Sequence, residues 1–154
     1  MRDINNITIE KMSEDNYKKI ALLAKENLAE AWSESTFFAQ LSNPNDCTFI
    51  AYCGGEPAGF ISVWCIMDEA EINNIAVNEK FRRKGIAKAL LTQAEKALLN
   101  AQRWVLEVRE SNENAISLYK KSGFENAGMR KNFYSNPTEN GIIMVKVFGE
   151  NNGN

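Results

Sequence analysis

The segment Arg82-Arg83-Lys84-Gly85-Ile86-Ala87 lies between an apolar run, residues 72–77, and a run with helical periodicity, residues 86–99. A turn from a strand into a helix exposes the first N–H groups of the helix, and cations beside them make that end attractive to anions. Gly85 and Ala87 carry little or no side chain, so a ligand can approach the backbone closely. The segment therefore predicts a phosphate-binding turn, with a solvated basic turn as the alternative.

Two common glycine-rich phosphate motifs are excluded. A P-loop needs two glycines five positions apart followed by Lys and Ser or Thr, and a dinucleotide fingerprint needs G-x-G-x-x-G. Neither string occurs in the chain. The strand before the basic segment and the helix after it favour pyrophosphate binding over a solvated turn.

The length and charge of the chain limit its class. The 154 residues predict a single domain over 1–148 with a disordered polar tail at 149–154. The formal net charge of -2 argues against a general nucleic-acid binder. The start of the chain lacks a signal peptide, and no apolar window reaches the length of a membrane span, so we expect a soluble, cytoplasmic protein without a membrane partner.

Cysteine and histidine usage constrains the chemistry. The three cysteines have no C-x-x-C spacing and the chain has no histidine, so we expect no metal site and reduced thiols. Without histidine, Ser/His and Cys/His nucleophilic mechanisms are excluded. In an enzyme of this composition, Glu, Asp, Tyr, Lys or Cys must move the protons.

The hydrophobic pattern predicts an α/β (α+β) fold. Strands are expected at 4–11, 48–53, 58–67, 70–77, 104–108, 124–134 and 142–148. Helices are expected after a Ser13 cap to residue 28, from Ser33 to 41, over 85–100, and from Asn112 or Asn114 to Gly123. The helix over 85–100 would join two parallel strands. The result is a mixed, mostly antiparallel sheet of about seven strands, flanked by about four helices, with one parallel β-α-β crossover.

Four segments together resemble the GNAT-fold N-acetyltransferase family: residues 72–77, 82–87, 106–112 (Leu-Glu-Val-Arg-x-Ser-Asn) and 115–124. Residues 31–37 and the hairpin over 130–144 are similar to the RimI branch of that family, which acetylates the N-terminal alanine of a small-subunit ribosomal protein. One departure is Asn140-Gly141, where the resemblance would place Asp-Ala. The acceptor contacts of that hairpin therefore stay open.

The resemblance implies acetyl-CoA as cosubstrate, bound near the parallel crossover. The N–H groups from about Arg83 to Ala87 would hold the pyrophosphate, assisted by the basic side chains. The backbone of Ile75 or Val77 would stabilise an oxyanion. The implied cofactor-binding residues are Ile75, Ala76, Val77, Arg82, Arg83, Lys84, Gly85, Ile86, Ala87, Asn112 and Tyr119.

By the same resemblance, Glu107 is the general base, directly or through water, and Tyr119 is the acid that protonates the departing thiolate. From the residues alone, Glu107 reads as a glutamate on the wet face of an edge strand and Tyr119 as a half-buried aromatic. Acceptor binding would fall to Trp32, Glu107, Arg109 and Tyr134, with core packing as the alternative for Trp32.

Three functions are compatible with these residues. The first is transfer of an acetyl group to the N-terminal alanine of a ribosomal protein. The second keeps the fold and the cosubstrate but acts on a small amine or another protein N-terminus. The third is a module that binds acyl-CoA without turnover, and loss of the base or the acid would favour it. The presence of both Glu107 and Tyr119 favours an enzyme.

Overall fold

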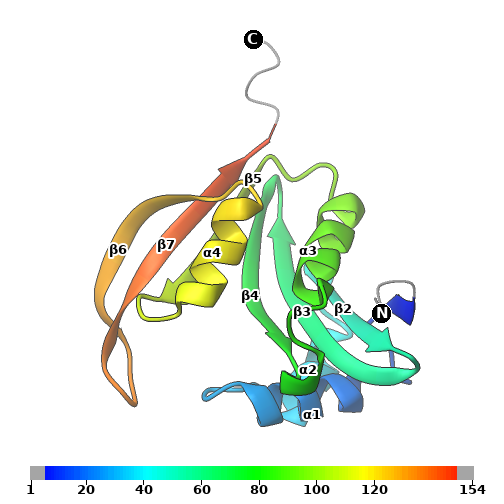
Figure 1. Ribbon diagram of the computed structural model, residues 1–154. Coiled ribbons are helices and arrows are strands. Elements are labelled where there is room, and N and C mark those ends of the chain that lie inside the picture. The colour runs from blue at the N-terminus through cyan, green and yellow to red at the C-terminus, as the bar shows by residue number, and fades with distance from the viewer. Residues whose placement is uncertain (1–5, 149–154) are drawn as a thin grey trace. The chain divides into compact units, whose positions relative to one another are not determined.

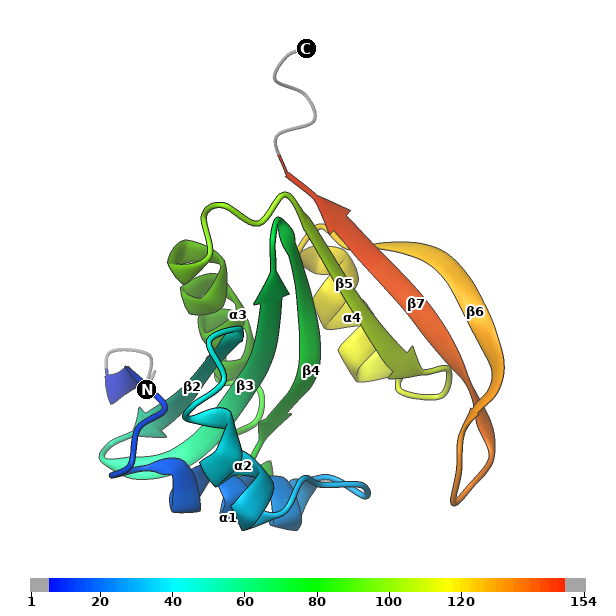
Figure 2. The ribbon, with the colours of Figure 1, turned by 180° about the vertical axis from the view of Figure 1, so that it is seen from behind.

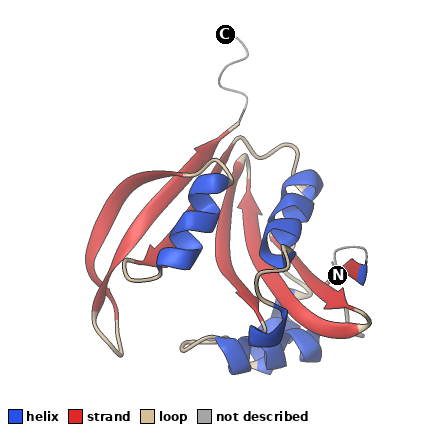
Figure 3. Ribbon diagram, viewed as in Figure 1, coloured by secondary structure: helices blue, strands red, loops and turns tan. Residues whose placement is uncertain are grey.

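A computed structural model describes residues 6–148 of the chain (Figures 1 and 3). The order of elements is β1 Ile7–Lys11, α1 Tyr17–Asn27, α2 Glu34–Gln40, β2 Asp46–Cys53, β3 Glu56–Ile66, β4 Glu69–Val77, the 3-10 helix η2 Glu79–Phe81, α3 Ile86–Ala97, β5 Arg103–Arg109, α4 Glu113–Lys121, β6 Glu125–Tyr134 and β7 Glu139–Val147. Each expected strand and helix is present, with ends shifted by a few residues. The tail predicted at 149–154 lies outside the described residues, as does the start of the strand predicted at 4–11.

The strands form one hydrogen-bonded sheet in the order β1-β2-β3-β4-β5-β7-β6. β4 and β5 pair in parallel, with Glu69 opposite Arg103 and Ile72 opposite Leu106. The pairs β1–β2, β2–β3, β5–β7 and β6–β7 are antiparallel. The predicted mixed sheet with one parallel crossover is confirmed.

The chain divides into two compact units. The first comprises the residues up to Trp64 together with Asn74–Leu98, and the second comprises Cys65–Asn73 together with the residues from Leu99 onward. The single domain expected over residues 1–148 stays a prediction.

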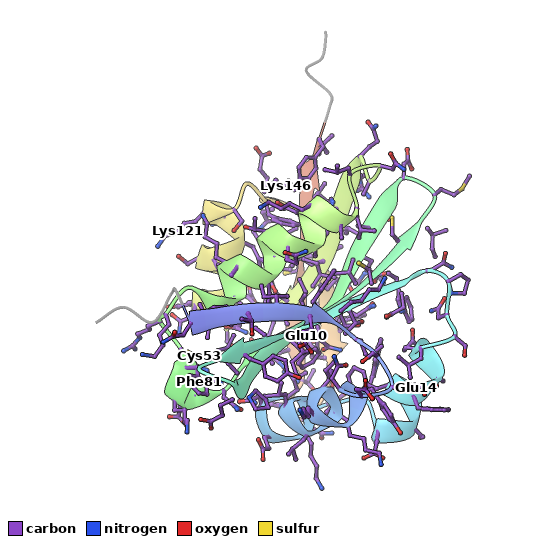
Figure 4. All side chains as sticks on the ribbon, turned by 90° about the vertical axis from the view of Figure 1, so that its right-hand side faces the viewer. Glu10, Glu14, Cys53, Phe81, Lys121 and Lys146 are labelled. Atoms are coloured by element: carbon purple, nitrogen blue, oxygen red, sulfur yellow. The ribbon has the colours of Figure 1, made fainter. Side chains whose placement is uncertain are left out.

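Strands β1 to β3 of the first unit have helices on both faces. The two views of the ribbon and the side view, in which Glu10 marks β1, place α1 and α2 on one face and α3 on the other (Figures 1, 2 and 4). Apolar side chains spaced along α1 and alternating along β2 meet in one cluster, because the helical and strand periods each put them on one side. Its fully buried members are Ile20, Ala24, Phe37, Ile50 and Phe60.

In the second unit, α4 lies against one face of β5 and β7 (Figures 1 and 2). Trp104, Leu106 and Val108 alternate along β5 and are buried. Burying a large apolar side chain stabilises the fold by about 1.5 to 3 kcal/mol, so these residues fix which face of β5 turns inward. The residues between them, among them Glu107 and Arg109, therefore lie on the opposite face.

Two of the predicted helix caps are present and one is wrong. The Ser33 side chain accepts a hydrogen bond from the Thr36 N–H (3.2 Å) and caps α2 as predicted. Asn112, one of the two candidates, caps α4 by accepting from the Ala115 N–H (3.2 Å). The Ser13 cap is wrong, because α1 begins only at Tyr17, after Asn16.

Two of the three cysteines, Cys47 and Cys53, are buried, Cys65 is partly exposed, and all three are free thiols. Among residues 6–148, none of the helices is both long and apolar enough to cross a membrane.

Candidate active site

The basic turn belongs to the first unit and leads from η2 into α3. Arg83 and Gly85 both adopt left-handed backbone, with φ of 66° and 82°. Gly85 is the N-cap of α3 and supplies no capping side chain, and the first turn of this helix carries no acidic residue. The first N–H groups of α3, at Ile86 and Ala87, are therefore not covered by a side-chain cap. Such N–H groups at a helix start suit an anion.

The turn is tied to the end of β4. The Arg82 Nε donates a hydrogen bond to the Val77 carbonyl oxygen (3.0 Å). Ile75 and Val77 are half-buried at this end of β4, and Ala76 is buried. Close approach of β3 at this point depends on Gly59, where an added Cβ would lie 2.7 Å from the Ala76 carbonyl oxygen.

Asn78, which follows β4, connects the end of this strand to β3 and to α1. This role was not predicted from the sequence. The Asn78 N–H donates to the Ala58 carbonyl (2.8 Å), and its Oδ1 accepts from the Asn27 Nδ2 at the end of α1 (2.6 Å). Its own Nδ2 reaches the Pro57 carbonyl (3.4 Å). The position of Asn78 directly after a strand was the available signal, since asparagine there commonly bonds to neighbouring backbone.

Glu107 belongs to the second unit and lies on the face of β5 opposite α4. Its Oε2 forms an ion pair with the Arg130 Nε of β6 (2.5 Å), and the side chains are 22% and 60% exposed respectively. β5 lies between β4 and β7, so Glu107 is not on an edge strand. A partly shielded carboxylate that water still reaches is suited to exchanging protons with a ligand.

Glu71 and Asn73 lie beside Glu107 on the neighbouring strand. Glu71 is opposite Val105 in the parallel register, so Glu107 is its diagonal neighbour on the same face. Burial, followed by the negative charges of Glu107 and Glu69, raises the pKa of the Glu71 carboxyl, and Arg130 opposes this. The Asn73 Nδ2 atom is shut off from solvent and has no hydrogen-bond partner among residues 6–148.

Tyr119 lies on the inner face of α4 and is 4% exposed. Its ring packs edge-on against Phe124, with centroids 5.7 Å apart. Burial, and to a lesser degree the nearby Tyr134, raises the pKa of the Tyr119 phenol well above its usual value. The phenol therefore stays protonated at neutral pH and can act as a hydrogen-bond donor.

Arg109 holds the turn between β6 and β7. Its guanidinium donates to the carbonyls of Ser135 (2.8 Å) and Pro137 (3.0 Å), pairs with Glu139 (3.1 Å), and stacks over the Tyr134 ring at 4.6 Å. Hydrogen bonds from Ser111 and Arg109 lower the pKa of the Glu139 carboxyl. The predicted acceptor residues Arg109 and Tyr134 are thus in contact with each other, and their role toward an acceptor stays a prediction.

The Asn140-Gly141 departure has a structural setting in the same hairpin. The Asn140 side chain accepts from the Asn132 N–H (2.9 Å) and donates to Glu110 (3.2 Å). At Gly141 an added Cβ would lie 3.2 Å from the Phe133 ring and 3.3 Å from the Tyr134 ring. The missing side chain therefore leaves room for this aromatic pair.

Trp32 of the first unit is half-buried. Its ring stacks on Trp64 with centroids 5.7 Å apart and packs against Phe37 at 5.5 Å. The Trp64 Nε1 donates to Gln40 (2.9 Å). Trp32 packs against the core while keeping an exposed edge, so both sequence-based interpretations of this residue stay open.

The residues of the described part suit an anionic cofactor better than a metal ion. In the described part of the chain, no group of three or more His, Cys, Asp or Glu side chains could hold a metal ion. The turn over 82–87 combines basic side chains with N–H groups at a helix start, which fits the pyrophosphate of a coenzyme A ester. Asn112 uses its Oδ1 in the α4 cap, so a contact from this side chain to the pantetheine arm would use Nδ2.

Comparison with known proteins identifies the class. The sequence model of the acetyltransferase (GNAT) family matches residues 10–124. The [ribosomal protein bS18]-alanine N-acetyltransferase of Escherichia coli K12 is 39% identical over 119 residues, which cover 74% of this chain and 79% of the relative. An N-alpha-acetyltransferase of Sulfurisphaera tokodaii is 34% identical over 136 residues, covering 79% and 80% of the two chains.

The fold agrees with these relatives. The crystal structure of the ribosomal-protein-S18-alanine N-acetyltransferase from Escherichia coli superposes with a TM-score of 0.84 at 32% identity, covering 94% of this chain and 97% of that one. The chain belongs to the GNAT acetyltransferase family. It is an acetyl-CoA-dependent N-acetyltransferase.

Proposed function

We propose that the chain transfers the acetyl group of acetyl-CoA to the α-amine of a ribosomal protein that begins with alanine. The observation that carries the proposal is the 39% identity, over three quarters of the chain, to a relative named for that reaction on protein bS18. Because ribosomal proteins are made in the cytoplasm, the proposal includes a cytoplasmic location, and three free cysteines accord with a reducing compartment.

The proposed roles of the first unit concern the cosubstrate. The N–H groups from Arg83 to Ala87 hold the pyrophosphate, and Arg82, Arg83 and Lys84 add positive charge. The backbone N–H of Ile75 or Val77 at the end of β4 stabilises the oxyanion that forms when the amine adds to the thioester carbonyl.

The proposed role of Glu107 is to accept the proton of the acceptor. An α-amine has a pKa near 8, so most of it is ammonium at neutral pH and must lose a proton before it attacks. Glu107 is a carboxylate with 22% of its side chain exposed, and the chain has no histidine to compete for this role. The proton passes to Glu107, directly or through water, and the nitrogen lone pair then attacks.

Tyr119 is proposed to assist the leaving group. A thiol has a pKa of about 8.5, well below that of a buried phenol, so complete proton transfer from Tyr119 to the thiolate is uphill. The raised pKa therefore favours donation of a hydrogen bond to the departing thiolate. Solvent can supply the proton after the thiolate has left.

The decisive experiment incubates the protein with labelled acetyl-CoA and synthetic peptides that carry the N-termini of ribosomal proteins. We expect the label on the α-amine of the peptide that begins with the bS18 sequence. If only small amines are labelled, the acceptor is a small amine and not a protein N-terminus. Binding of acetyl-CoA with no labelled product would indicate a module that binds acyl-CoA without turnover.

A further inference from the structure

The guanidinium group of Arg109 uses most of its binding capacity inside the protein. An arginine side chain offers five N–H donors and a flat face. In Arg109, Nη1 donates to the Pro137 carbonyl and to the Glu139 carboxylate, and Nη2 donates to the Ser135 carbonyl. One face of the group lies over the Tyr134 ring. Three of these bonds and one face are therefore engaged by the hairpin of β6 and β7 itself.

The positive charge of Arg109 is matched as well. Its ion pair with Glu139 is shielded, since the two side chains are 22% and 17% exposed. In the Arg103–Glu69 pair, at the other end of β5, both side chains are about half exposed. Water screens a shielded pair less than an exposed one. Arg109 is thus poorly suited to receive a carboxylate or a carbonyl group of an acceptor, although the sequence predicted it as an acceptor residue.

Glu139 connects the hairpin to the start of α4. Its Oε1 receives the Arg109 guanidinium, and its Oε2 accepts a hydrogen bond from the Ser111 N–H. Ser111 directly precedes Asn112, the N-cap of α4, and the Asn112 N–H donates to the Arg109 carbonyl (3.0 Å). The backbone of Arg109 therefore holds the cap of α4 while its side chain, through Glu139, holds the residue before it. We call Arg109, Glu139 and Ser111 the hairpin clamp.

Tyr134 is the residue through which the hairpin clamp reaches the candidate site. Its ring rests on the Arg109 guanidinium, and Arg109 follows Glu107 by two residues on the same face of β5. Two residues along a strand span about 6.5 Å. Tyr134 also contributes to the raised pKa of the Tyr119 phenol. Tyr134 thus lies near both residues that are proposed to handle protons.

We propose that Arg109 and Glu139 are positioning residues for the reaction and that Arg109 does not bind the acceptor. The hairpin clamp fixes the turn between β6 and β7 to the start of α4, and in this way it sets where the Tyr134 ring stands. This inference rests on the proposed function, because the place of Tyr134 matters only if the acceptor reacts beside Glu107. Loosening the clamp should weaken use of the acceptor and leave binding of acetyl-CoA intact.

The first test replaces Arg109 by lysine, which keeps the charge. A lysine ammonium is a point charge, so it cannot bind two carbonyls and a carboxylate in one plane or lie flat on a ring. Arg109→Lys should raise the peptide KM about three- to tenfold, with kcat within about twofold of the wild type. The acetyl-CoA affinity, measured by calorimetry, should not change. Arg103→Lys is the matched control, because Arg103 lies on the same face of β5 in an exposed ion pair, and its peptide KM should equal that of the wild type.

A double-mutant cycle shows whether Arg109 acts through Tyr134. In a Tyr134→Ala background the clamp has no ring to place, so Arg109→Lys should change the peptide KM by less than about twofold. Effects that multiply in full would mean that Arg109 acts on the acceptor independently of Tyr134, and they would overturn the proposal. Glu139→Gln repeats the cycle from the other side of the clamp, in case Arg109→Lys does not fold.

Hydrogen exchange tests the hairpin clamp without any substrate. In Arg109→Lys, the Ser111 N–H and the amides of residues 135–139 should exchange about tenfold faster than in the wild type, because their local opening becomes easier. Arg103→Lys should leave these rates unchanged. Unchanged exchange in Arg109→Lys overturns the positioning role, whatever the kinetics show. Faster exchange in a protein that acetylates no peptide supports the clamp and counts against the proposed acceptor instead.

Discussion

Replacing Glu107 by Gln keeps the shape of the side chain and removes the carboxylate that would accept the acceptor's proton. The structural cost should be small, because Arg130, which loses its partner, is 60% exposed and stays solvated. Loss of such an exposed pair costs about 0 to 1 kcal/mol of unfolding free energy. A large fall in activity would then reflect the loss of the general base and not a loss of stability.

The expected loss follows from the role of a general base. Removing one should lower kcat/KM for the peptide by about 10² to 10⁴ at pH 7. With an amine pKa near 8, the free amine rises from about a tenth of the total at pH 7 to about nine tenths at pH 9. The kcat/KM of the variant should therefore rise about tenfold from pH 7 to pH 9, because at the higher pH the amine is already deprotonated and needs no base from the enzyme.

Initial rates with labelled acetyl-CoA at pH 7 and pH 9 measure both effects, and calorimetry checks that acetyl-CoA binding is unchanged. Glu125→Gln is the control, because Glu125 is an exposed carboxylate at the start of β6. Wild-type rates in Glu107→Gln, or a loss that pH 9 does not relieve, would refute the assignment of Glu107 as base.

Four further outcomes are expected. Tyr119→Phe should lower kcat about tenfold or more without recovery at high pH, because it removes a hydrogen-bond donor to the thiolate and not a base; equal recovery in both variants would count against this role. Combined Arg82→Ala and Arg83→Ala should weaken acetyl-CoA binding about tenfold or more by calorimetry, whereas unchanged affinity would reject phosphate binding. Trp32→Ala should raise the peptide KM more than the acetyl-CoA KM, and an equal effect on both would show that Trp32 serves core packing and not acceptor binding. Burial raises the pKa of Asp46 from 3.8 to about 6. The folded state therefore binds the carboxyl proton of Asp46 more tightly than the unfolded state does, and the protein loses stability as the pH rises from 3.8 to about 6. Asp46→Asn should therefore stabilise the fold by about 1 kcal/mol at pH 7, after discounting for partial exposure, and by little at pH 3.5, as chemical denaturation at the two pH values can check.

The order and type of the elements could be predicted because hydrophobic periods of two and 3.6 are local properties of the chain. The Ser13 cap failed for an equally local reason. Asn16 accepts from the Ser13 N–H (2.8 Å) and donates to the Lys11 carbonyl (3.1 Å), so its side chain holds the end of β1 and delays the helix. Competing side-chain bonds of this kind are not visible in a periodic pattern.

The candidate site was predictable only where a motif is contiguous. The turn over 82–87 is such a motif, and it lies between a strand and a helix as expected. The Glu107–Arg130 pair and the neighbouring Glu71 and Asn73 arise from the register of strands that are distant in the chain. Register of that kind follows from the whole sheet, so sequence reasoning did not reach Glu71, Asn73 or the pairing of Arg130 with Glu107.

The space at Gly141 couples three positions of the hairpin sterically. A methyl group there would press on the rings of Phe133 and Tyr134, which lie 5.0 Å apart and edge to face. Alanine at this position therefore requires the two rings to move by a few tenths of an ångström or to adopt other rotamers. The placement of the side chains at positions 133 and 134 should therefore depend on residue 141, and grafting an acceptor preference from one homologue onto another should be tried with all three positions exchanged together.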